Sequence, residues 1–273
     1  MTQDVLNVVS IIMAAGRGSR MKGYSGNKTL LPLVPGNTPF EGESPILLHL
    51  FANLPQGPKA LIVNHCKTDV MQLAADTNAV CFEQPVLNGT GGAILAAEDF
   101  LNAISSDTVL ITMGDVPFVR KETYHTLVAG LLDHELMVLG FSPQDKKQYG
   151  VLEIDGRHVK KITEWKYWRE YPDHRKDALT ICNSGIYAAR RKTLCHYLPV
   201  LASCPQIVRK EVNGCLTDIE EFFFTDLVEY MVRDGLAVGY HVTADEHETM
   251  GVDDLEALRK AQEFYSRKQG SAG

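Results

Sequence analysis

Short apolar runs rich in β-branched residues alternate with longer amphipathic segments through the first half of the chain, and this alternation narrows the possible folds most. The apolar runs span residues 8–13, 60–64, 80–83 and 108–113. Between them, apolar residues recur at helical spacing over residues 45–54, 68–75 and 91–101. This order is typical of β-α-β units, in which helices cover a parallel sheet. We therefore expect an α/β fold.

The pattern changes after Phe141. Two short runs, residues 150–154 and 158–162, flank the Asp155-Gly156 pair, which is the strongest short signal for a β-hairpin. A charged and aromatic stretch, residues 164–177, is expected to form an exposed excursion or flap. Further strands are expected at residues 178–188 and 237–242, and helices at 192–201, 219–234 and 255–267. Residues 269–273 are expected to be a disordered tail.

The length of the chain limits the number of domains, and its net charge limits the classes of binding partner. At roughly 150 residues per domain, 273 residues correspond to one or two domains. We find no linker that divides the chain, so we expect a single domain over residues 1–268. The formal charge of −7 disfavours binding to nucleic acid or to an anionic membrane.

Apolar runs and cysteine spacing bear on the compartment. The apolar opening, residues 5–15, is far shorter than the ~20 residues that a membrane span needs. We recognise no secretory signal, and the six cysteines form no C-x-x-C pair. We therefore expect no zinc site, reduced thiols and a cytoplasmic location.

A glycine-rich loop follows the first apolar run. Residues 11–21 read I-I-M-A-A-G-R-G-S-R-M, and backbone amides of such a loop can converge on an anion. The loop does not complete a Walker A motif, and Met21 stands where a dinucleotide fingerprint needs its third glycine. Basic residues cluster in and after it, at Arg17, Arg20, Lys22 and Lys28. A phosphate site and a tight turn with solvated basic side chains are equally compatible with the loop alone.

A series of further motifs makes a family resemblance specific. The segment A-A-G-R-G-S-R-M followed by N-K-T-L-L-P-L (residues 14–21 and 27–33) resembles the signature of nucleotide-sugar pyrophosphorylases, most closely the uridylyltransferase domains of bacterial N-acetylglucosamine-1-phosphate uridylyltransferases. More matches follow in the family's order: Q-P-V-L-N-G-T-G-G-A (84–93), M-G-D-V-P (113–117), Y-G-V (149–151), T-E-W-K (163–166), N-S-G-I-Y (183–187), F-F-T-D (223–226) and G-V-D-D (251–254). The resemblance covers nearly the whole chain.

The resemblance implies a fold and its division. It implies a Rossmann-like three-layer α/β/α architecture with a mostly parallel central sheet and an antiparallel sugar-binding subregion. Residues 1–115 would form the nucleotide-binding part, residues 116–252 the sugar-binding part and residues 253–268 a C-terminal helix.

Asp115 is the best candidate for a metal ligand. It follows the apolar run 108–113, so its carboxylate is expected at the carboxyl edge of the sheet, where open α/β folds bind ligands. Magnesium takes one or two protein carboxylates and leaves its other positions to phosphate oxygens and water. The resemblance offers Asp253 as the second ligand, although Asp253 or Asp254 could equally be a helix N-cap. The family commonly has Asn where Asp253 stands.

The resemblance also implies roles for the other site residues. It assigns catalysis to Arg20, Lys28 and Asp115. It assigns nucleotide binding to Ala14, Ala15, Gly16, Gly18, Lys28, Gln84, Gly89 and Thr90. Sugar binding falls to Gly150, Glu164, Asn183 and Thr225. An amide such as that of Gln84 offers the donor and acceptor that a pyrimidine edge requires. By default, Glu164 would be a solvated charge and Asn183 a turn former.

The implied activity is Mg²⁺-dependent nucleotidyl transfer. UTP and N-acetylglucosamine 1-phosphate would give UDP-N-acetylglucosamine and pyrophosphate. Another sugar or an alcohol phosphate, with CTP for example, remains an alternative, as does a non-catalytic nucleotide-binding regulatory module. A molybdopterin nucleotidyltransferase shares the opening motif but agrees less well with the later ones. The oligomeric state stays open.

Three departures from the family bear on these expectations. Asn27 replaces the usual Pro, and the spacing from Met21 to Lys28 is one residue longer than in the uridylyltransferase domains that the chain resembles. The chain also lacks the hexapeptide repeats of the bifunctional relatives, so we do not expect acetyl transfer or β-helix trimerisation of it.

Overall fold

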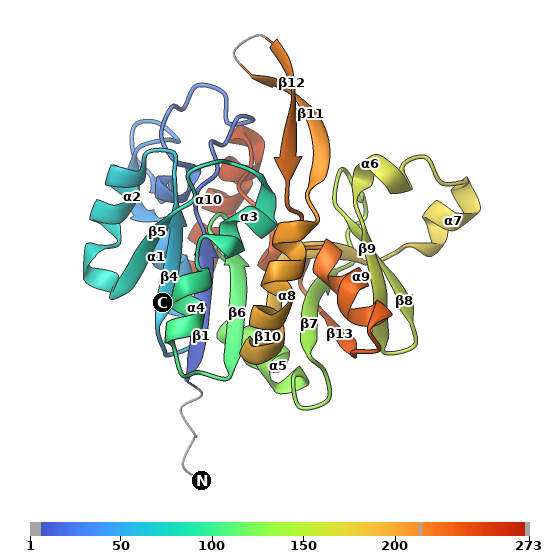
Figure 1. The fold of residues 1–273 in the computed structure, drawn as a ribbon. Coiled ribbons are helices and arrows are strands. Elements are labelled where there is room, and N and C mark those ends of the chain that lie inside the picture. The colour runs from blue at the N-terminus through green and yellow to red at the C-terminus, as the bar shows by residue number, and fades with distance from the viewer. Residues whose placement is uncertain (1–6, 213–214, 271–273) are drawn as a thin grey trace.

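The computed structural model describes residues 7–212 and 215–270. A nine-stranded sheet runs through its centre in the order β5-β4-β1-β6-β10-β7-β13-β9-β8 (Figure 1). Its first four strands are all parallel: β5 (Ala79–Glu83), β4 (Lys59–Val63), β1 (Val8–Met13) and β6 (Thr108–Met113). These are the four strands expected from the first half of the sequence.

The second half of the sheet is mixed. Strand β10 (Cys182–Arg190) lies antiparallel between β6 and β7 (Leu136–Phe141). Strand β13 (Val238–Val242) is parallel to β7, and the predicted hairpin of β8 (Val151–Asp155) and β9 (His158–Thr163) completes this edge. The antiparallel subregion that the sequence indicates is therefore present.

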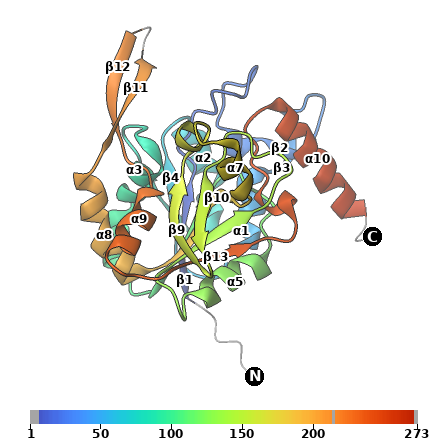
Figure 2. The same ribbon diagram turned by 90° about the vertical axis from the view of Figure 1, so that its right-hand side faces the viewer.

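Helices cover both faces of the sheet (Figures 1 and 2). One face carries α3 (Gly89–Leu95), α4 (Glu98–Ala103), α8 (Arg191–Ser203) and α9 (Asp226–Arg233). The other carries α1 (Ile46–Asn53), α2 (Lys67–Leu73) and α5 (Lys121–Gly130). Strand β1 is buried from both sides, since Ile11 packs with the first group and Ile12 with the second. This confirms the three-layer α/β/α fold.

Smaller elements surround the loop that follows β1. Strands β2 (Pro32–Pro35) and β3 (Gly42–Pro45) form a short hairpin, and α10 (Leu255–Gly270) packs against β2. The buried Gln262 donates a hydrogen bond to the Pro32 carbonyl over 2.9 Å. The described residues also form the 3₁₀ helices η1 (Lys28–Leu30), η2 (Ala75–Thr77) and η3 (Glu246–Thr249).

The aromatic excursion folds into two short helices, α6 (Trp165–Trp168) and α7 (Asp173–Ala178). Trp168 is buried against Phe141 and Val151, and its indole Nε1 donates to the Tyr149 carbonyl over 2.8 Å. Most of the excursion is exposed, as expected, but Trp168 is buried, and Trp165 and Tyr171 are partly buried in the same cluster. The flap therefore covers the β8-β9 hairpin.

Several boundaries differ from the expected ones. The helix expected over residues 219–234 begins at Asp226, because residues 219–221 belong to β12 (Cys215–Glu221), which pairs with β11 (Gln206–Val212) in a hairpin projecting from the body (Figures 1 and 2). The helix expected over residues 91–101 is divided into α3 and α4, and the strand expected at residue 178 begins at Cys182. Helix α10 includes Gln269 and Gly270 of the expected tail, and residues 271–273 lie outside the described part.

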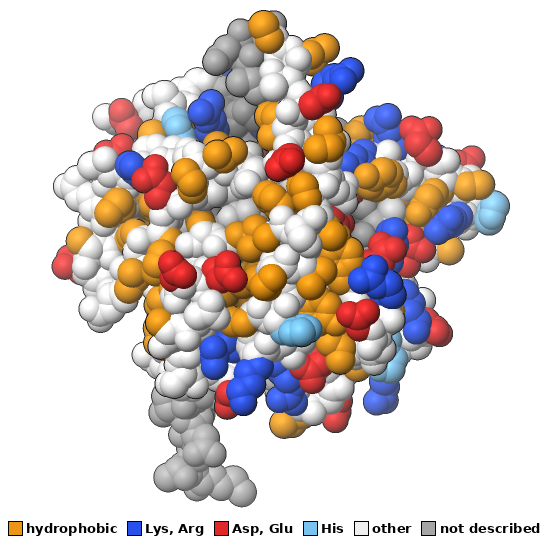
Figure 3. All heavy atoms as spheres, viewed as in Figure 1, with side chains coloured by type: hydrophobic (Ala, Val, Ile, Leu, Met, Phe, Trp, Pro, Cys, Tyr) orange, Lys and Arg blue, Asp and Glu red, His pale blue; other side chains and the backbone are white. Residues whose placement is uncertain are grey.

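Two further observations concern the charges on the surface and the apolar character of the helices. Acidic and basic side chains are interspersed on the face that Figure 3 shows. Within residues 7–212 and 215–270, none of the helices combines the length and the apolar character needed to cross a bilayer.

Candidate active site

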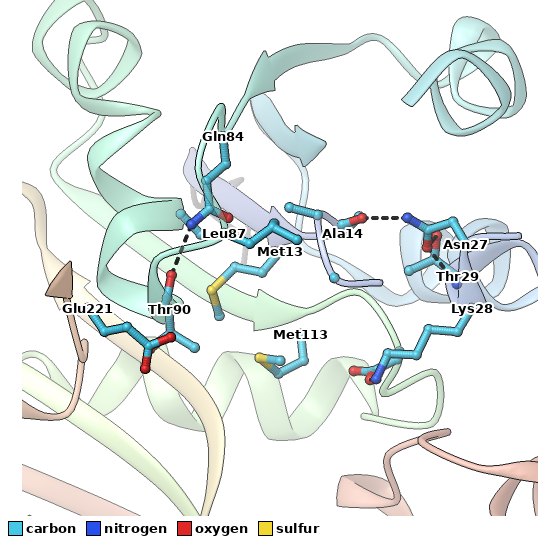
Figure 4. Close-up of a pocket in the computed structure, with 15 residues that line it drawn as sticks. Met13, Ala14, Asn27, Lys28, Thr29, Gln84, Leu87, Thr90, Met113 and Glu221 are labelled. Carbon is cyan, nitrogen blue, oxygen red and sulfur yellow. Dashed lines mark hydrogen bonds and ion pairs between the residues drawn. The ribbon is translucent and has the colours of Figure 1, made fainter. Parts of the chain in front are cut away.

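A cavity of about 260 Å³ opens at the carboxyl ends of β1 and β6 (Figure 4). This is the edge where the two parallel strands deliver their following loops, Ala14–Gly16 after β1 and Asp115 after β6. The cavity is lined by Met13, Ala14, Ala15, Gly16, Asn27, Lys28, Thr29, Gln84, Leu87, Gly89, Thr90, Ala93, Met113, Asp115 and Glu221. Of the eight expected nucleotide-binding residues, all but Gly18 line it.

The loop after β1 is held in place by Asn27, whose side chain is completely buried. Its amide Nδ2 donates to the carbonyls of Ala14 over 2.7 Å and of His65 over 3.0 Å. Its Oδ1 accepts from the Thr29 backbone N–H over 3.0 Å and from the Thr29 hydroxyl over 2.9 Å. Asn27 therefore fixes the start of η1, where Lys28 stands.

Gly18 supplies the sharp turn of this loop. Its φ is +60°, a conformation that residues with a Cβ rarely adopt, and its carbonyl accepts from the Met21 N–H over 2.8 Å. A Cβ placed on Gly18 would lie 3.5 Å from Cδ of Lys28. The lysine stem therefore runs directly along the glycine-rich loop.

Lys28 joins the two expected metal ligands. Its Nζ donates to Oδ1 of Asp253 over 2.6 Å and forms an ion pair with Oδ2 of Asp115. Arg20 reaches the same Oδ1 of Asp253 over 3.0 Å from an exposed position. A backbone hydrogen bond also joins the two acidic segments, because the Val252 N–H donates to the Asp115 carbonyl over 2.9 Å. The three expected catalytic residues and both expected metal ligands thus lie in one cluster.

Charge and burial act against each other in this cluster. Burial alone would lower the pKa of Lys28, but Asp115 and Asp253 outweigh it and raise that pKa above its ordinary value. Burial would raise the pKa of Asp253, and the positive charges of Lys28 and Arg20 reverse this and lower it. The ion pairs therefore keep Lys28 and Asp253 charged at neutral pH.

The opposite end of the cavity is built around Gln84, which is 4 % exposed. Its Nε2 donates to the Gly89 carbonyl over 3.1 Å and to Oδ1 of Asn88 over 3.0 Å. The Thr90 hydroxyl accepts from the Phe224 N–H over 3.2 Å. The first turn of α3 is therefore tied to the segment that follows β12.

The four expected sugar-binding residues form two bonded pairs. Glu164 accepts from the Thr225 hydroxyl over 2.9 Å, and the Asn183 N–H donates to the Gly150 carbonyl over 2.8 Å. Burial raises the pKa of Glu164. None of the four lines the 260 Å³ cavity; Glu164 instead borders a neighbouring groove of about 500 Å³ with Lys166 and other side chains.

Asn27 and Glu221 are among the cavity-lining residues that were not singled out from the sequence. Asn27 appeared there only as a departure from the family's proline. Glu221 ends β12, is 5 % exposed and lines the cavity near Thr90 (Figure 4). Its signal was hidden because a helix was expected over residues 219–234, on which a glutamate is ordinarily a solvated charge.

Fold and site together, with a glycine-rich loop beside paired carboxylates at a sheet edge, are typical of nucleotide-handling proteins. The chain belongs to the family described as "MobA-like NTP transferase domain", whose sequence pattern matches residues 10–196. The expected membership among nucleotidyltransferases is confirmed.

Individual relatives narrow the comparison. The chain is 28 % identical over 268 residues to the bifunctional protein GlmU of Ruegeria pomeroyi, covering 96 % of this chain and 54 % of the relative. It is 31 % identical over 267 residues to the GlmU of Cereibacter sphaeroides, covering 96 % and 53 %. The chain thus spans about half the length of these curated relatives.

Solved structures share the fold. A putative glucose-1-phosphate thymidylyltransferase from Bacillus anthracis superposes with a TM-score of 0.67 at 20 % identity, covering 94 % of this chain and 95 % of that one. A CMP:2-keto-3-deoxy-manno-octonic acid synthetase complexed with CTP gives 0.64 at 16 % identity, covering 96 % and 99 %.

Proposed function

We propose that the chain transfers a nucleotidyl group from UTP to N-acetylglucosamine 1-phosphate and releases pyrophosphate. One observation carries this proposal: Lys28 meets Asp115 and Asp253 at one end of a cavity whose other end holds Gln84 and Thr90. The first group suits phosphates and the second suits a base edge. The choice of UTP and of this sugar is supported by the motif resemblance and by the GlmU relatives.

The carboxylate pair fits a magnesium ion. Oxygens of Asp115 and Asp253 both contact Nζ of Lys28, so they converge on one point. They are hard oxygen donors, and two carboxylates leave room for phosphate oxygens and water. When bound there, Mg²⁺ would offset the negative charge that gathers on the phosphate oxygens during transfer.

In the proposed reaction, an oxygen of the sugar 1-phosphate attacks the α-phosphorus of UTP. A new phosphorus–oxygen bond forms, the bond between the α- and β-phosphates breaks, and pyrophosphate leaves with the electron pair. Such transfers need positioning and charge compensation rather than a protein nucleophile. Lys28, Arg20 and the amides of Gly16 and Gly18 would supply both, with pyrophosphate leaving toward the glycine-rich loop.

The remaining residues would select the substrates. Gln84, with Gly89 and Thr90, would hold the base, while Glu164 and Asn183 would bind sugar hydroxyl and N-acetyl groups. We extend this to the chain as a whole. Residues 1–115 would bind the nucleotide, residues 116–252 the sugar, and residues 253–268 would close the site with Asp253.

Pyrophosphate release tests this proposal. The purified chain is assayed with UTP, CTP, TTP, GTP and ATP against a panel of sugar and alcohol phosphates, with Mg²⁺ and with EDTA. The highest kcat/KM is expected for UTP with N-acetylglucosamine 1-phosphate, and EDTA should abolish it. A higher value for another pair reassigns the substrate. If no pair of substrates releases pyrophosphate, catalysis is refuted and a regulatory nucleotide-binding module is favoured.

A matched pair of variants ties the activity to the site. Lys28→Met should lower kcat by orders of magnitude, because Lys28 contacts both carboxylates and would compensate the charge of the phosphates. Lys192→Met removes the same charge from an exposed position on α8 and should leave kcat unchanged. Equal rates for both variants would remove Lys28 from the mechanism.

A further inference from the structure

The Lys28 ammonium occupies the meeting point of the two carboxylates. Its Nζ contacts Oδ2 of Asp115 and lies 2.6 Å from Oδ1 of Asp253. The side chains of Lys28 and Asp115 are only 16 % and 7 % exposed, so water screens this contact poorly. A positive charge is thus already present where the proposed metal ion would bind.

We propose that Lys28 is the resident counter-ion of this site and excludes a divalent cation until a phosphate draws the lysine away. The ammonium contacts both carboxylates, and the exposed Arg20 shares Oδ1 of Asp253 with it. A divalent cation held by the same oxygens would lie beside a like charge at contact distance, which is strongly unfavourable in a partly buried site. Lysine and metal therefore compete for Asp115 and Asp253. This inference rests on the proposed function only for the identity of the phosphate.

The local structure allows the Lys28 ammonium to move to a second position. Asn27 anchors its backbone, so the movement is confined to the four-carbon stem. That stem runs along Gly18 of the glycine-rich loop. Phosphates cradled by this loop would lie beside the stem, so a rotation about its side-chain bonds would transfer Nζ from the carboxylates to the phosphates. Metal and triphosphate would then bind cooperatively, each favouring the other.

Metal binding without nucleotide tests this directly. Mn²⁺ binding to the full chain is measured by electron paramagnetic resonance, with Mn²⁺ as the probe. We expect Lys28→Met to bind Mn²⁺ about tenfold or more tightly than the wild type, because the competing charge is gone. Adding Asp115→Asn to Lys28→Met should abolish the gain, which places it at this site. Unchanged or weaker Mn²⁺ binding by a folded Lys28→Met chain overturns the inference.

Two controls guard this result. Lys67→Met removes a lysine from an exposed ion pair with Glu83 and should leave Mn²⁺ affinity unchanged. If Lys28→Met does not fold, Lys28→Gln replaces it, because the amide still donates to a carboxylate without carrying a charge. The same gain in Mn²⁺ affinity is expected of Lys28→Gln.

The wild-type chain provides an independent readout. Acylation of Lys28 by acetic anhydride is followed by mass spectrometry without nucleotide. The paired ammonium should react slowly, and saturating Mn²⁺ should release it and raise its rate several-fold while Lys192 stays constant. An unchanged Lys28 rate at saturating Mn²⁺ refutes the competition. Both metal experiments stand even if pyrophosphate release fails, so the counter-ion role and the proposed activity are tested separately.

Discussion

Replacing Asn27 by alanine should destabilise the chain and misplace Lys28 at the same time. The substitution removes four hydrogen bonds made by a completely buried side chain. At about 1 kcal/mol net for each bond, the expected loss is about 3 to 4 kcal/mol, with some relief because water can enter the space left by the amide. At about 2 °C for each kcal/mol in a chain of this size, the melting temperature should fall by about 6 to 8 °C.

Calorimetry and steady-state kinetics measure the two effects. Asn102→Ala serves as the control, since Asn102 is exposed on α4 and should change the melting temperature by less than about 1 °C. At a temperature where both variants are folded, Asn27→Ala should lower kcat/KM about a hundredfold through the displaced lysine. A melting temperature within about 2 °C of the control would refute the assignment of Asn27 as the anchor of this loop.

Three further perturbations follow from the structure. Glu248 is buried and accepts from the Arg120 Nε over 2.8 Å, from the Arg120 N–H and from the hydroxyls of Thr123 and Thr243. Burial raises its pKa but these donors outweigh burial and lower it, so its stabilisation is present above the unfolded-state pKa and is lost as pH falls through the folded-state pKa. Glu248→Gln should therefore cost about 2 kcal/mol at pH 7, and urea unfolding should show this cost shrinking in acid. Ionisation of Glu164 has the opposite effect on stability, because burial raises its pKa and its ionisation opposes folding as pH rises. Glu164→Gln should therefore unfold at a higher urea concentration than the wild type at pH 8, while its KM for the sugar phosphate should be higher. An unchanged KM would remove Glu164 from the sugar site. Gly89→Ala should cost about 1 to 3 kcal/mol, because φ is +94° and a Cβ would collide with the Phe222 carbonyl; a chemical denaturation curve that matches the wild type would contradict this.

The parallel half of the fold could be predicted because its signals are local. Strands β1, β4, β5 and β6 are apolar runs, and the helix α1 buries Ile46, Leu47 and Leu50 on one face. The β11-β12 hairpin could not be predicted in the same way. It pairs with itself outside the main sheet, so its residues show no continuous buried pattern, and Ile207 and Leu216 are exposed. Because the apolar pattern of α9 is strong, the helix expected from the sequence also included residues 219–221, which belong to β12.

The residues of the candidate site likewise include some that local sequence could identify and some that it could not. Residues embedded in contiguous motifs, such as Gly16, Gln84 and Asp115, could be named because local spacing and family resemblance point to them. Glu221 could not be named, because its place beside the cavity depends on tertiary contacts such as those of the Phe222 carbonyl with the Gly91 N–H and of the Phe222 N–H with the Asn88 carbonyl. Which groups contact one another also stayed open, since Lys28 and Asp253 are 225 residues apart.

Asn27 departs from the family's proline, and the hydrogen bonds of its side chain compensate for the lost restriction of the backbone. A proline at this position would restrict φ but could donate no hydrogen bond. Asn27 has φ −79° and extended backbone geometry, which a proline could also adopt, and its side chain adds bonds to the loop after β1, to the loop after β4 and to η1. The position of Lys28 therefore depends on these bonds rather than on a restricted backbone. Because they reach residues 13 and 38 positions away in sequence, the loop can be one residue longer and still bring the lysine to Asp115 and Asp253.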